Sequence, residues 1–240
     1  MTDEPKPAAT SASTDPRARI VDALLALAAE RRFEEISIAD IAGRAQVSFA
    51  DFRDAFPSKG AILAGFARRI DRVALSAGGA DLDASKRDRL FDALMRRLDA
   101  MAPYREGLRE IVAWLRRDPV SALAMNASVI NSLRFALASA GIDSEGVSGA
   151  IKLQGLALAW TRIVGVWLDD AEPDLSKTMA ELDRELTRGE RAAAAVEGLE
   201  KFVAPFAAAA QAACAKSRRA GDAVRRRARG EDAPRSAGQP

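Results

Sequence analysis

The sequence offers few side chains of the kinds that catalyse reactions. Its 240 residues include no histidine and one cysteine, Cys214, which lies in an Ala-rich stretch and is interpreted as a small, inert apolar residue. These absences exclude histidine-based acid–base catalysis, Ser-His-Asp and Cys-His nucleophiles, His-ligated metals and cysteine-based zinc clusters. Asp169 and Asp170 are adjacent carboxylates, but acids placed before a proline such as Pro173 usually cap or end a helix. We therefore predict no catalytic residue, no metal site and no cofactor.

The polar side chains between residues 37 and 59 suit a different chemistry, the binding of phosphate oxygens and base edges. Cations and the N–H groups at helix starts bind phosphate without base preference. The candidates for this role are Ser37, Arg44 and Lys59. A second group, at the start of one short predicted helix, would face a groove of a duplex: Ser48, Phe49, Ala50 and Arg53.

The spacing of apolar residues predicts the longer helices that position these side chains. A helix over residues 17–31 has Asp15 as its expected cap and Pro16 in its first turn. Its apolar stripe consists of Ile20, Val21, Leu24, Leu25 and Ala28. A later helix begins at Ser58, after Pro57, and its stripe consists of Ile62, Leu63, Phe66 and Ile70.

Two short helices are expected between these longer ones. Each begins at a serine with an aspartate three residues later, Ser37 with Asp40 and Ser48 with Asp51. Both pairs are variants of the capping box in which aspartate replaces glutamate. Two short helices joined by a tight turn at residues 45–48 predict a helix-turn-helix, a motif that places its second helix in the major groove of DNA.

The rest of the chain has a helical pattern to about residue 215, interrupted by prolines and glycines. No run alternates with period two for long enough to form a strand. We therefore predict an all-α protein. Its expected parts are a disordered arm at 1–16, the helix-turn-helix domain at 17–72, an all-α region at 82–215 and a disordered basic tail at 216–240.

Charge is distributed unevenly along the chain. The formal net charge is +2, but residues 216–240 carry +5, which leaves residues 1–215 at −3. Residues 17–72 hold ten basic and eight acidic side chains, so phosphate binding depends on local cations rather than on net charge. No uninterrupted apolar run reaches the roughly 20 residues of a membrane helix, and the N-terminus does not have the apolar segment of a secretory signal. We expect a cytoplasmic protein.

A pattern without gaps runs from Ile20 to Leu63. Its positions are Ile20, Phe33, Ser37-Ile38-x-x-Ile41-Ala42, Ala45, Val47, Ser48, Phe56-Pro57-Ser58-Lys59, Ile62 and Leu63. In these residues the chain resembles the N-terminal domain of TetR-family transcriptional regulators. The resemblance implies a homodimeric repressor that binds an operator in double-stranded DNA. It also implies that region 82–215 is an all-α ligand-binding and dimerisation domain, in which a bound ligand changes the separation of the two reading helices.

The predicted reading helix departs from the family pattern. The chain has Phe49-Ala50-Asp51-Phe52-Arg53, whereas the family commonly has a small polar or basic residue followed by Gly-Thr-Leu-Tyr. Arg53 takes the place of a phosphate-contacting tyrosine and can itself bind phosphate. Asp51 either caps the helix with Ser48 or accepts a hydrogen bond from cytosine, and Phe49 either touches a thymine methyl or packs against a partner. The alternative to DNA binding is a retained fold that no longer binds a specific site.

The region 151–168 is apolar nearly all round and is predicted to be a buried helix. Its tryptophans, Trp160 and Trp167, share one face. Side chains expected to join them around a cavity are Trp114, Met125, Phe135 and Leu156. The alternative is a solid core; a ligand in a cavity here would be a small apolar or amphipathic effector. A dimer interface is expected from residues 151–168 and 176–210.

Residues 166–186 carry a second, weaker pattern: Trp167-Leu168-x-Asp170, Pro173-Asp174, Thr178 and Leu182-Asp183-Arg184. This run is similar to the C-terminal part of TetR-fold lipid-binding proteins of ubiquinone biosynthesis. The similarity implies a competing hypothesis, a non-catalytic lipid-binding accessory protein that has lost specific DNA binding.

Overall fold

The computed structural model describes residues 15–76 and 83–194 of the chain. One unit ends at Gly189, and the last described residues belong to a second unit. The expectations for the arm before residue 15, for Cys214 and for the tail at 216–240 lie outside the described residues. All regular elements in the described ranges are helical, which confirms the all-α fold.

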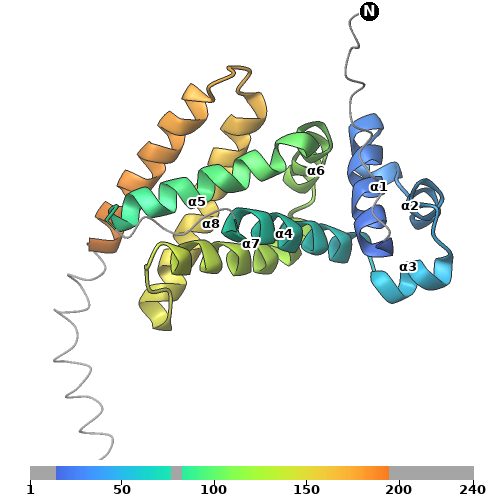
Figure 1. The fold of residues 1–240 in the computed structure, drawn as a ribbon, viewed down its shortest axis with the longest axis horizontal. Helices are drawn as coiled ribbons and strands as arrows, with labels where there is room; N and C mark the ends of the chain where they lie inside the picture. Colours follow the sequence, from blue (N-terminus) through green and yellow to red (C-terminus); the bar gives the residue numbers. More distant parts are fainter. Residues whose placement is uncertain (1–14, 77–82, 195–240) are drawn as a thin grey trace, which may run out of the picture. The chain divides into compact units, whose positions relative to one another are not determined.

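Ten labelled helical elements precede a final helical stretch. In chain order they are α1 (Pro16–Glu30), η1 (Phe33–Glu35), α2 (Ile38–Ala45), α3 (Phe49–Ala55), α4 (Lys59–Ser76), α5 (Lys86–Met101), η2 (Ala102–Tyr104), α6 (Arg105–Arg117), α7 (Pro119–Ser139) and α8 (Gly146–Asp169), followed by a helix over residues 176–194. Figure 1 shows α1, α2 and α3 grouped together, with α4 leading away from them.

The caps expected from the sequence are formed. The Asp15 carboxylate accepts a hydrogen bond from the N–H of Arg17, at 3.0 Å, and Pro16 occupies the first turn of α1. The Ser58 hydroxyl oxygen accepts one from the N–H of Ala61, at 3.2 Å, in the first turn of α4. Such side-chain acceptors satisfy N–H groups that have no partner within the helix. The predicted apolar stripes of both helices are buried.

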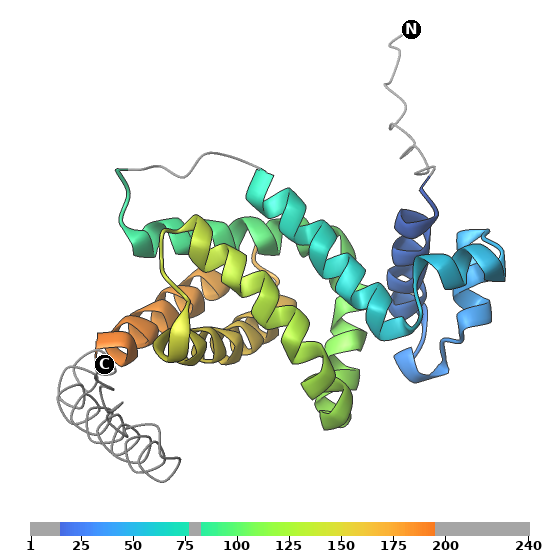
Figure 2. The same cartoon turned by 90° about the horizontal axis from the view of Figure 1, so that it is seen from below.

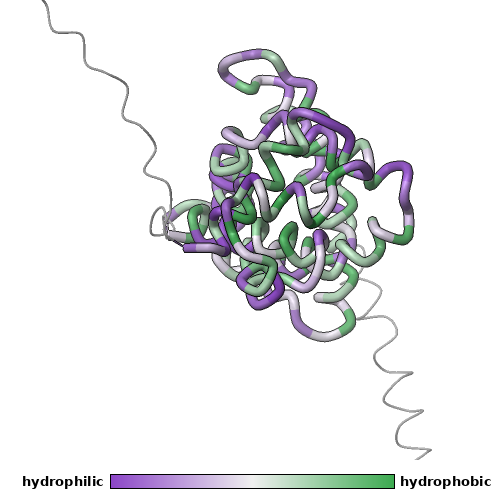
Figure 3. Tube along the Cα trace, turned by 90° about the vertical axis from the view of Figure 1, so that its right-hand side faces the viewer, coloured by the Kyte–Doolittle hydropathy of each residue, from purple (hydrophilic) through white to green (hydrophobic). Residues whose placement is uncertain are grey.

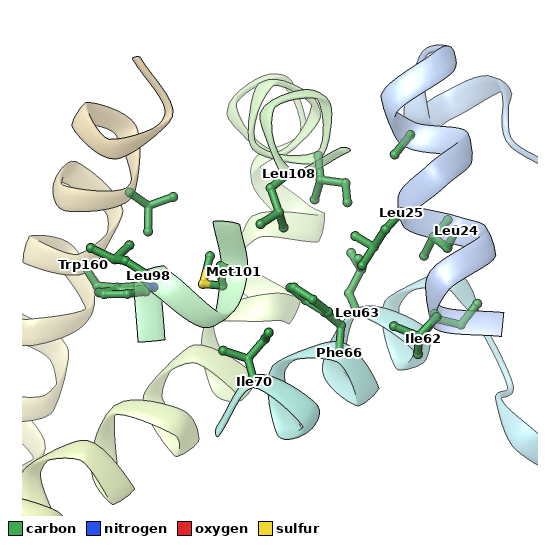
Figure 4. Packing of buried hydrophobic residues seen from close by; sticks show 14 of the residues in the cluster. Leu24, Leu25, Ile62, Leu63, Phe66, Ile70, Leu98, Met101, Leu108 and Trp160 are labelled. Atoms are coloured by element: carbon green, nitrogen blue, oxygen red, sulfur yellow. The ribbon is translucent and has the colours of Figure 1, made fainter. Parts of the chain in front are cut away.

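A continuous hydrophobic core connects the helix-turn-helix to the later helices. Figure 4 shows its members: Leu24 and Leu25 of α1, Ile62, Leu63, Phe66 and Ile70 of α4, Leu98 and Met101 of α5, Leu108 of α6 and Trp160 of α8. The helix α4 packs against α1 and also against α5 and α7. Figure 2 shows α4 and α7 side by side. This arrangement makes α4 the main connection between the two regions.

The helix α6 forms the second connection, because it crosses α1 at very close range. A Cβ atom added at Gly107 would lie 2.3 Å from the carbonyl oxygen of Leu25, so only glycine allows this approach. Further along α6, the Trp114 ring lies 4.4 Å from the ring of Phe33, centroid to centroid. The Glu110 carboxylate accepts a hydrogen bond from the N–H of Phe33 at 3.2 Å. The helix α6 therefore holds the segment that leads into α2.

One charged pair is buried among the later helices, which the sequence analysis did not anticipate. The Arg97 guanidinium of α5 pairs with the carboxylate of Asp71 on α4 and lies over the ring of Trp160 on α8. The Ser132 hydroxyl of α7 donates a hydrogen bond of 2.7 Å to the same carboxylate. Burial lowers the pKa of Arg97 to about 10, which still leaves it charged at neutral pH. The pair ties four helices together, and breaking it on one side would leave an uncompensated buried charge.

The outer face of α7 and α8 is apolar. Figure 3 shows hydrophobic and hydrophilic stretches alternating along the helices, as amphipathic packing requires. The large exposed apolar side chains on this face are Val120, Leu123 and Phe135 of α7 and Val147, Ile151 and Leu158 of α8. Asn126 donates a hydrogen bond of 3.4 Å to Gln154, which places the two helices side by side at this surface.

The helix α7 is long and apolar. It has 21 residues, and 22% of its most apolar stretch is buried. By length and composition alone, this described helix is able to cross a membrane. Alanine, serine and asparagine interrupt its large apolar residues, so it is not an uninterrupted apolar run.

Candidate nucleic-acid interface

The first helix of the motif begins with a complete capping box. The Ser37 hydroxyl oxygen accepts a hydrogen bond of 3.1 Å from the N–H of Asp40, and the Asp40 carboxylate accepts one of 2.9 Å from the N–H of Ser37. The hydroxyl also donates to this carboxylate, at 2.7 Å. These bonds, together with Arg31 at 3.2 Å, lower the pKa of Asp40 to about 2, with the hydroxyl of Ser37 as the largest cause. The Ser37 side chain is therefore occupied in starting α2.

The turn between the two helices depends on a left-handed residue that is not glycine. Gln46 has φ 53° and ψ 48°, and its N–H donates to the carbonyl oxygens of Ala42 and Gly43 at the end of α2. A left-handed conformation costs a residue with a Cβ atom about 1–2 kcal/mol. The carbonyl of Gln46 accepts a hydrogen bond of 3.3 Å from Arg19 on α1. The turn is thus fixed from outside the motif as well as from within.

The second helix begins at Ser48 and has one buried and one exposed face. The Ser48 hydroxyl oxygen accepts a hydrogen bond of 3.1 Å from the N–H of Asp51, and the hydroxyl donates one of 2.7 Å to the Asp51 carboxylate. This contact favours the capping interpretation of Asp51 over contact with a base. Phe52 and Ala55 are buried against the other helices.

The exposed face of α3 brings together the predicted groove-facing residues. Phe49 is 65% exposed, which is unusual for a large apolar side chain, and Ala50 and Arg53 lie on the same side of the helix. Within the described part of the chain, the Arg53 guanidinium makes no hydrogen bond or ion pair. It therefore remains available to an external anion.

Arg44 is exposed at the end of α2 but already has an anionic partner. Its guanidinium donates two hydrogen bonds to the carboxylate of Glu30, the last residue of α1, at 2.8 and 2.6 Å. This bidentate pair lowers the pKa of Glu30 and raises that of Arg44, so both remain charged at neutral pH. A phosphate bound at Arg44 would have to compete with Glu30.

Lys59 occupies an internal position rather than an open one. Its ammonium donates hydrogen bonds of 2.9 Å to the carbonyl oxygens of Phe33 and Ile36 and lies 4.6 Å from the centre of the Phe33 ring. Partial burial lowers its pKa, an effect that the nearby charge of Glu34 opposes. Lys59 thus attaches the start of α4 to the segment before α2, and one of its three N–H donors is not used by these contacts.

Two arginines that the sequence analysis did not select support the motif from α1. Arg17 donates a hydrogen bond to the carbonyl oxygen of Ala55 and lies over the ring of Phe56, 4.9 Å from its centre, while Arg19 reaches the turn. These contacts join residues 27 or 38 positions apart. The spacing of residues within one helix does not predict contacts over such distances in sequence. The roles of Arg17 and Arg19 were therefore not predicted.

Comparison with solved structures identifies the fold. No protein-family model and no curated protein matches the sequence. A TetR transcriptional regulator from Nitrosomonas europaea ATCC 19718 superposes with a TM-score of 0.58 at 22% identity, over 73% of this chain and 98% of that one. A second from Rhodococcus sp. RHA1 gives a TM-score of 0.52 at 18% identity, over 72% and 95% of the two chains.

The chain has the TetR fold. In both comparisons the match covers nearly all of the other chain, so it includes the later helices as well as the helix-turn-helix. The resemblance that the sequence suggested for residues 17–70 is thereby confirmed at the level of the fold.

The six side chains predicted to surround a cavity have different surroundings in this TetR fold. Phe135 is half exposed on the outer face of α7, and Trp114 packs against Phe33 rather than toward the later helices. Trp160 and Trp167 are buried beneath the guanidinium groups of Arg97 and Arg105. Met125 and Leu156 pack partly buried against the core. The cavity that the sequence predicts around these side chains therefore stays a prediction.

The motif at residues 166–186 has a structural explanation within the TetR fold. The Asp170 carboxylate accepts hydrogen bonds of 2.9 and 2.7 Å from the N–H and hydroxyl of Thr178, in the first turn of the last described helix. Asp169 pairs with Arg109 of α6 at 2.9 Å. Asp170 therefore links the end of α8 to the start of the next helix, and Asp169 links the end of α8 to α6. The described residues contain no group of three or more Asp, Glu, Cys or His side chains placed to hold a metal ion.

Proposed function

We propose that this protein is a homodimeric DNA-binding transcriptional regulator of the TetR type, acting as a ligand-responsive repressor in the cytoplasm. The observation that carries the proposal is the exposed face of α3, where Phe49, Ala50 and an unpaired Arg53 lie on the second helix of a helix-turn-helix. In this motif the start of the second helix contacts base edges in the major groove.

The phosphate contacts in this proposal come from the ends of the motif. Arg53 holds phosphate directly, and Arg44 does so by exchanging Glu30 for a phosphate oxygen. Lys59 contributes through its remaining donor, and Ser37 through the helix start that it caps. Ser48 fixes the direction of α3. The cost of displacing Glu30 gives this interface a lower intrinsic affinity than its number of cations suggests.

The dimer is proposed to form through the outer face of α7 and α8. Leu123 lies one turn from Asn126, and Ile151 and Leu158 lie one turn to either side of Gln154, so these apolar side chains flank the Asn126–Gln154 contact. Exposed apolar patches of this kind mark interaction surfaces. Gly155 has no atom within 4 Å of an added Cβ, which leaves room for a second helix to approach.

A second candidate function, lipid binding, is favoured by the same helix. The helix α7 exposes Val120 and Leu123 and is long and apolar enough to contact a lipid phase. In that case the apolar face of α7 and α8 would bind a lipid rather than a second copy of the chain. The helix α3 would then bind no specific DNA site. The two candidates differ in what the purified protein binds.

The test measures binding of the full-length protein to DNA from its own upstream region across a salt series, against a random duplex. A regulator prefers the upstream duplex at physiological salt. A variant that lacks residues 216–240 controls for the +5 charge of that segment, which attracts any duplex. Equal affinity for both duplexes, together with lipid that co-purifies with the protein, would refute the regulator and support the second candidate.

A further inference from the structure

A groove on the surface between α6, α8 and the helix 176–194 is separate from the proposed DNA interface. Its volume is about 490 Å³, within the range of about 300–1,000 Å³ that small-molecule sites occupy. Arg116 contributes from α6, Arg162 from α8 and Lys177 from the last helix, and Gly165 and Val166 form part of its wall. None of the six side chains predicted to surround a cavity lines this groove.

Most charges around the groove already have partners. Arg162 pairs with Glu185 at 3.1 Å, and Lys177 pairs with Glu172 at 3.0 Å. On the acidic side, Asp169 pairs with Arg109, and the Asp170 carboxylate accepts the two hydrogen bonds from Thr178. The three ion pairs cancel most of the charge of their members. Asp170 stays negative, but its carboxylate is buried and bonded to Thr178.

Arg116 is the exception. Within the described part of the chain its guanidinium makes no hydrogen bond or ion pair. It lies against α8 at Gly165, where an added Cβ would be 3.1 Å from its Nη2 atom. The absence of a side chain at Gly165 therefore allows the guanidinium to lie over the helix backbone, inside the groove, with five N–H donors directed at no protein acceptor.

We propose that this groove binds a small amphipathic monoanion, a carboxylate with a short apolar body, with Arg116 as its anchor. A guanidinium without a protein acceptor fits one carboxylate, which it binds through two parallel hydrogen bonds. The Val166 side chain and the stems of Arg162 and Lys177 offer the apolar wall that the body of the ligand needs. The site goes beyond the proposed function, which assigns neither the ligand nor its place.

The test uses the full-length protein and two probes of equal chain length, sodium octanoate and 1-octanol. Calorimetry gives the Kd of each probe, and the shift of the Gly165 amide in a ¹⁵N–¹H spectrum reports where it binds. Octanoate is expected to shift this amide saturably and to bind more tightly than octanol. Arg116→Gln is expected to weaken octanoate binding about tenfold. Arg72→Gln, an exposed arginine of α4, is the matched control and leaves the Kd unchanged.

Two further variants separate charge from position. Arg116→Lys keeps the charge and recovers part of the affinity, whereas Gly165→Ala keeps Arg116 but moves its guanidinium, and weakens binding several-fold. The proposal is overturned by a Gly165 amide that does not titrate, by equal Kd values for octanoate and octanol, or by an Arg116→Gln variant that binds like wild type. Because no DNA is present, each of these results is independent of the proposed DNA binding.

Discussion

The guanidinium of Arg44 at the end of α2 and the carboxylate of Glu30 at the end of α1 form a bidentate ion pair, with hydrogen bonds of 2.8 and 2.6 Å. The pair is exposed, so it stabilises the fold only weakly. Its main consequence is electrostatic, because it neutralises the cation in the last turn of α2, just before the turn that leads to α3.

Removing this carboxylate is expected to strengthen DNA binding. Glu30→Gln leaves Arg44 free for phosphate and should lower the Kd for the upstream duplex about two- to fivefold, as expected for an exposed ion pair. Fluorescence anisotropy at several salt concentrations measures the Kd of wild type and variant. Glu35→Gln, which removes the same charge from η1, is the control. An equal effect of both variants would mean that only net charge had changed and that Arg44 contacts no phosphate.

The capping box at α2 predicts how stability depends on pH. The pKa of Asp40 is lowered from 3.8 to about 2, so its ionised form is favoured by folding. Its contribution is complete above about pH 4 and is lost as the pH falls toward 2. The difference in unfolding free energy between wild type and Asp40→Asn should therefore shrink as the pH falls from about 4 toward 2. Urea denaturation at each pH measures this difference.

Ser37→Ala provides the companion measurement. It removes the hydroxyl that is the largest cause of the lowered pKa, and it also removes the helix cap, at a cost of about 0.5–2 kcal/mol. In the Ser37→Ala background, the gap caused by Asp40→Asn should depend less on pH. A pH profile that stays the same in that background would show that the hydroxyl does not stabilise the carboxylate.

Two glycines in helices predict opposite effects of the same substitution. Gly107→Ala places a Cβ atom 2.3 Å from a backbone oxygen of α1, so the α6–α1 contact must separate and the fold should lose more than about 2 kcal/mol. Gly43→Ala in α2 meets no atom within 4 Å and should gain up to about 1 kcal/mol from helix propensity. Thermal unfolding measures the stability of both variants against wild type. A tolerated Gly107→Ala would contradict the close approach of α6 to α1.

The dimer interface is tested by placing a charge on the apolar face of α8. Leu158→Glu should convert a dimer into a monomer of 25.6 kDa, because a buried carboxylate without a partner opposes association. Light scattering after size exclusion measures the mass. Val73→Glu on α4, also exposed, is the control and should leave the dimer intact. A Leu158→Glu protein that remains dimeric would exclude this face as the interface.

The fold was largely predictable from the sequence because its determinants are local. Serine caps, Pro16 and the apolar stripes of α1 and α4 act within a few residues, and each forms as expected. The long-range contacts were not predictable. Nothing near Lys59 in the sequence indicates that its ammonium binds the carbonyl of Phe33, 26 residues away, and nothing near Trp114 indicates that it packs on the same ring.

The candidate site also has a part that was predictable from the sequence and a part that was not. The exposed face of α3 follows from helical spacing, which puts Phe49 and Arg53 on one side and buries Phe52. The pairing of Arg44 with Glu30 and the free guanidinium of Arg116 depend on how separate helices meet. The spacing of apolar residues does not predict which charged side chains of separate helices come into contact, so only the structure shows these contacts.

The central claim is that α3 contacts DNA through Arg53, and one comparison tests it most directly. The Kd of Arg53→Ala for the upstream duplex is measured across a salt series beside Arg68→Ala, an exposed arginine of α4. If Arg53 binds phosphate, Arg53→Ala weakens binding about tenfold and reduces the salt slope by about 1, while Arg68→Ala matches wild type. Arg53→Ala binding with the wild-type Kd and slope would contradict the account.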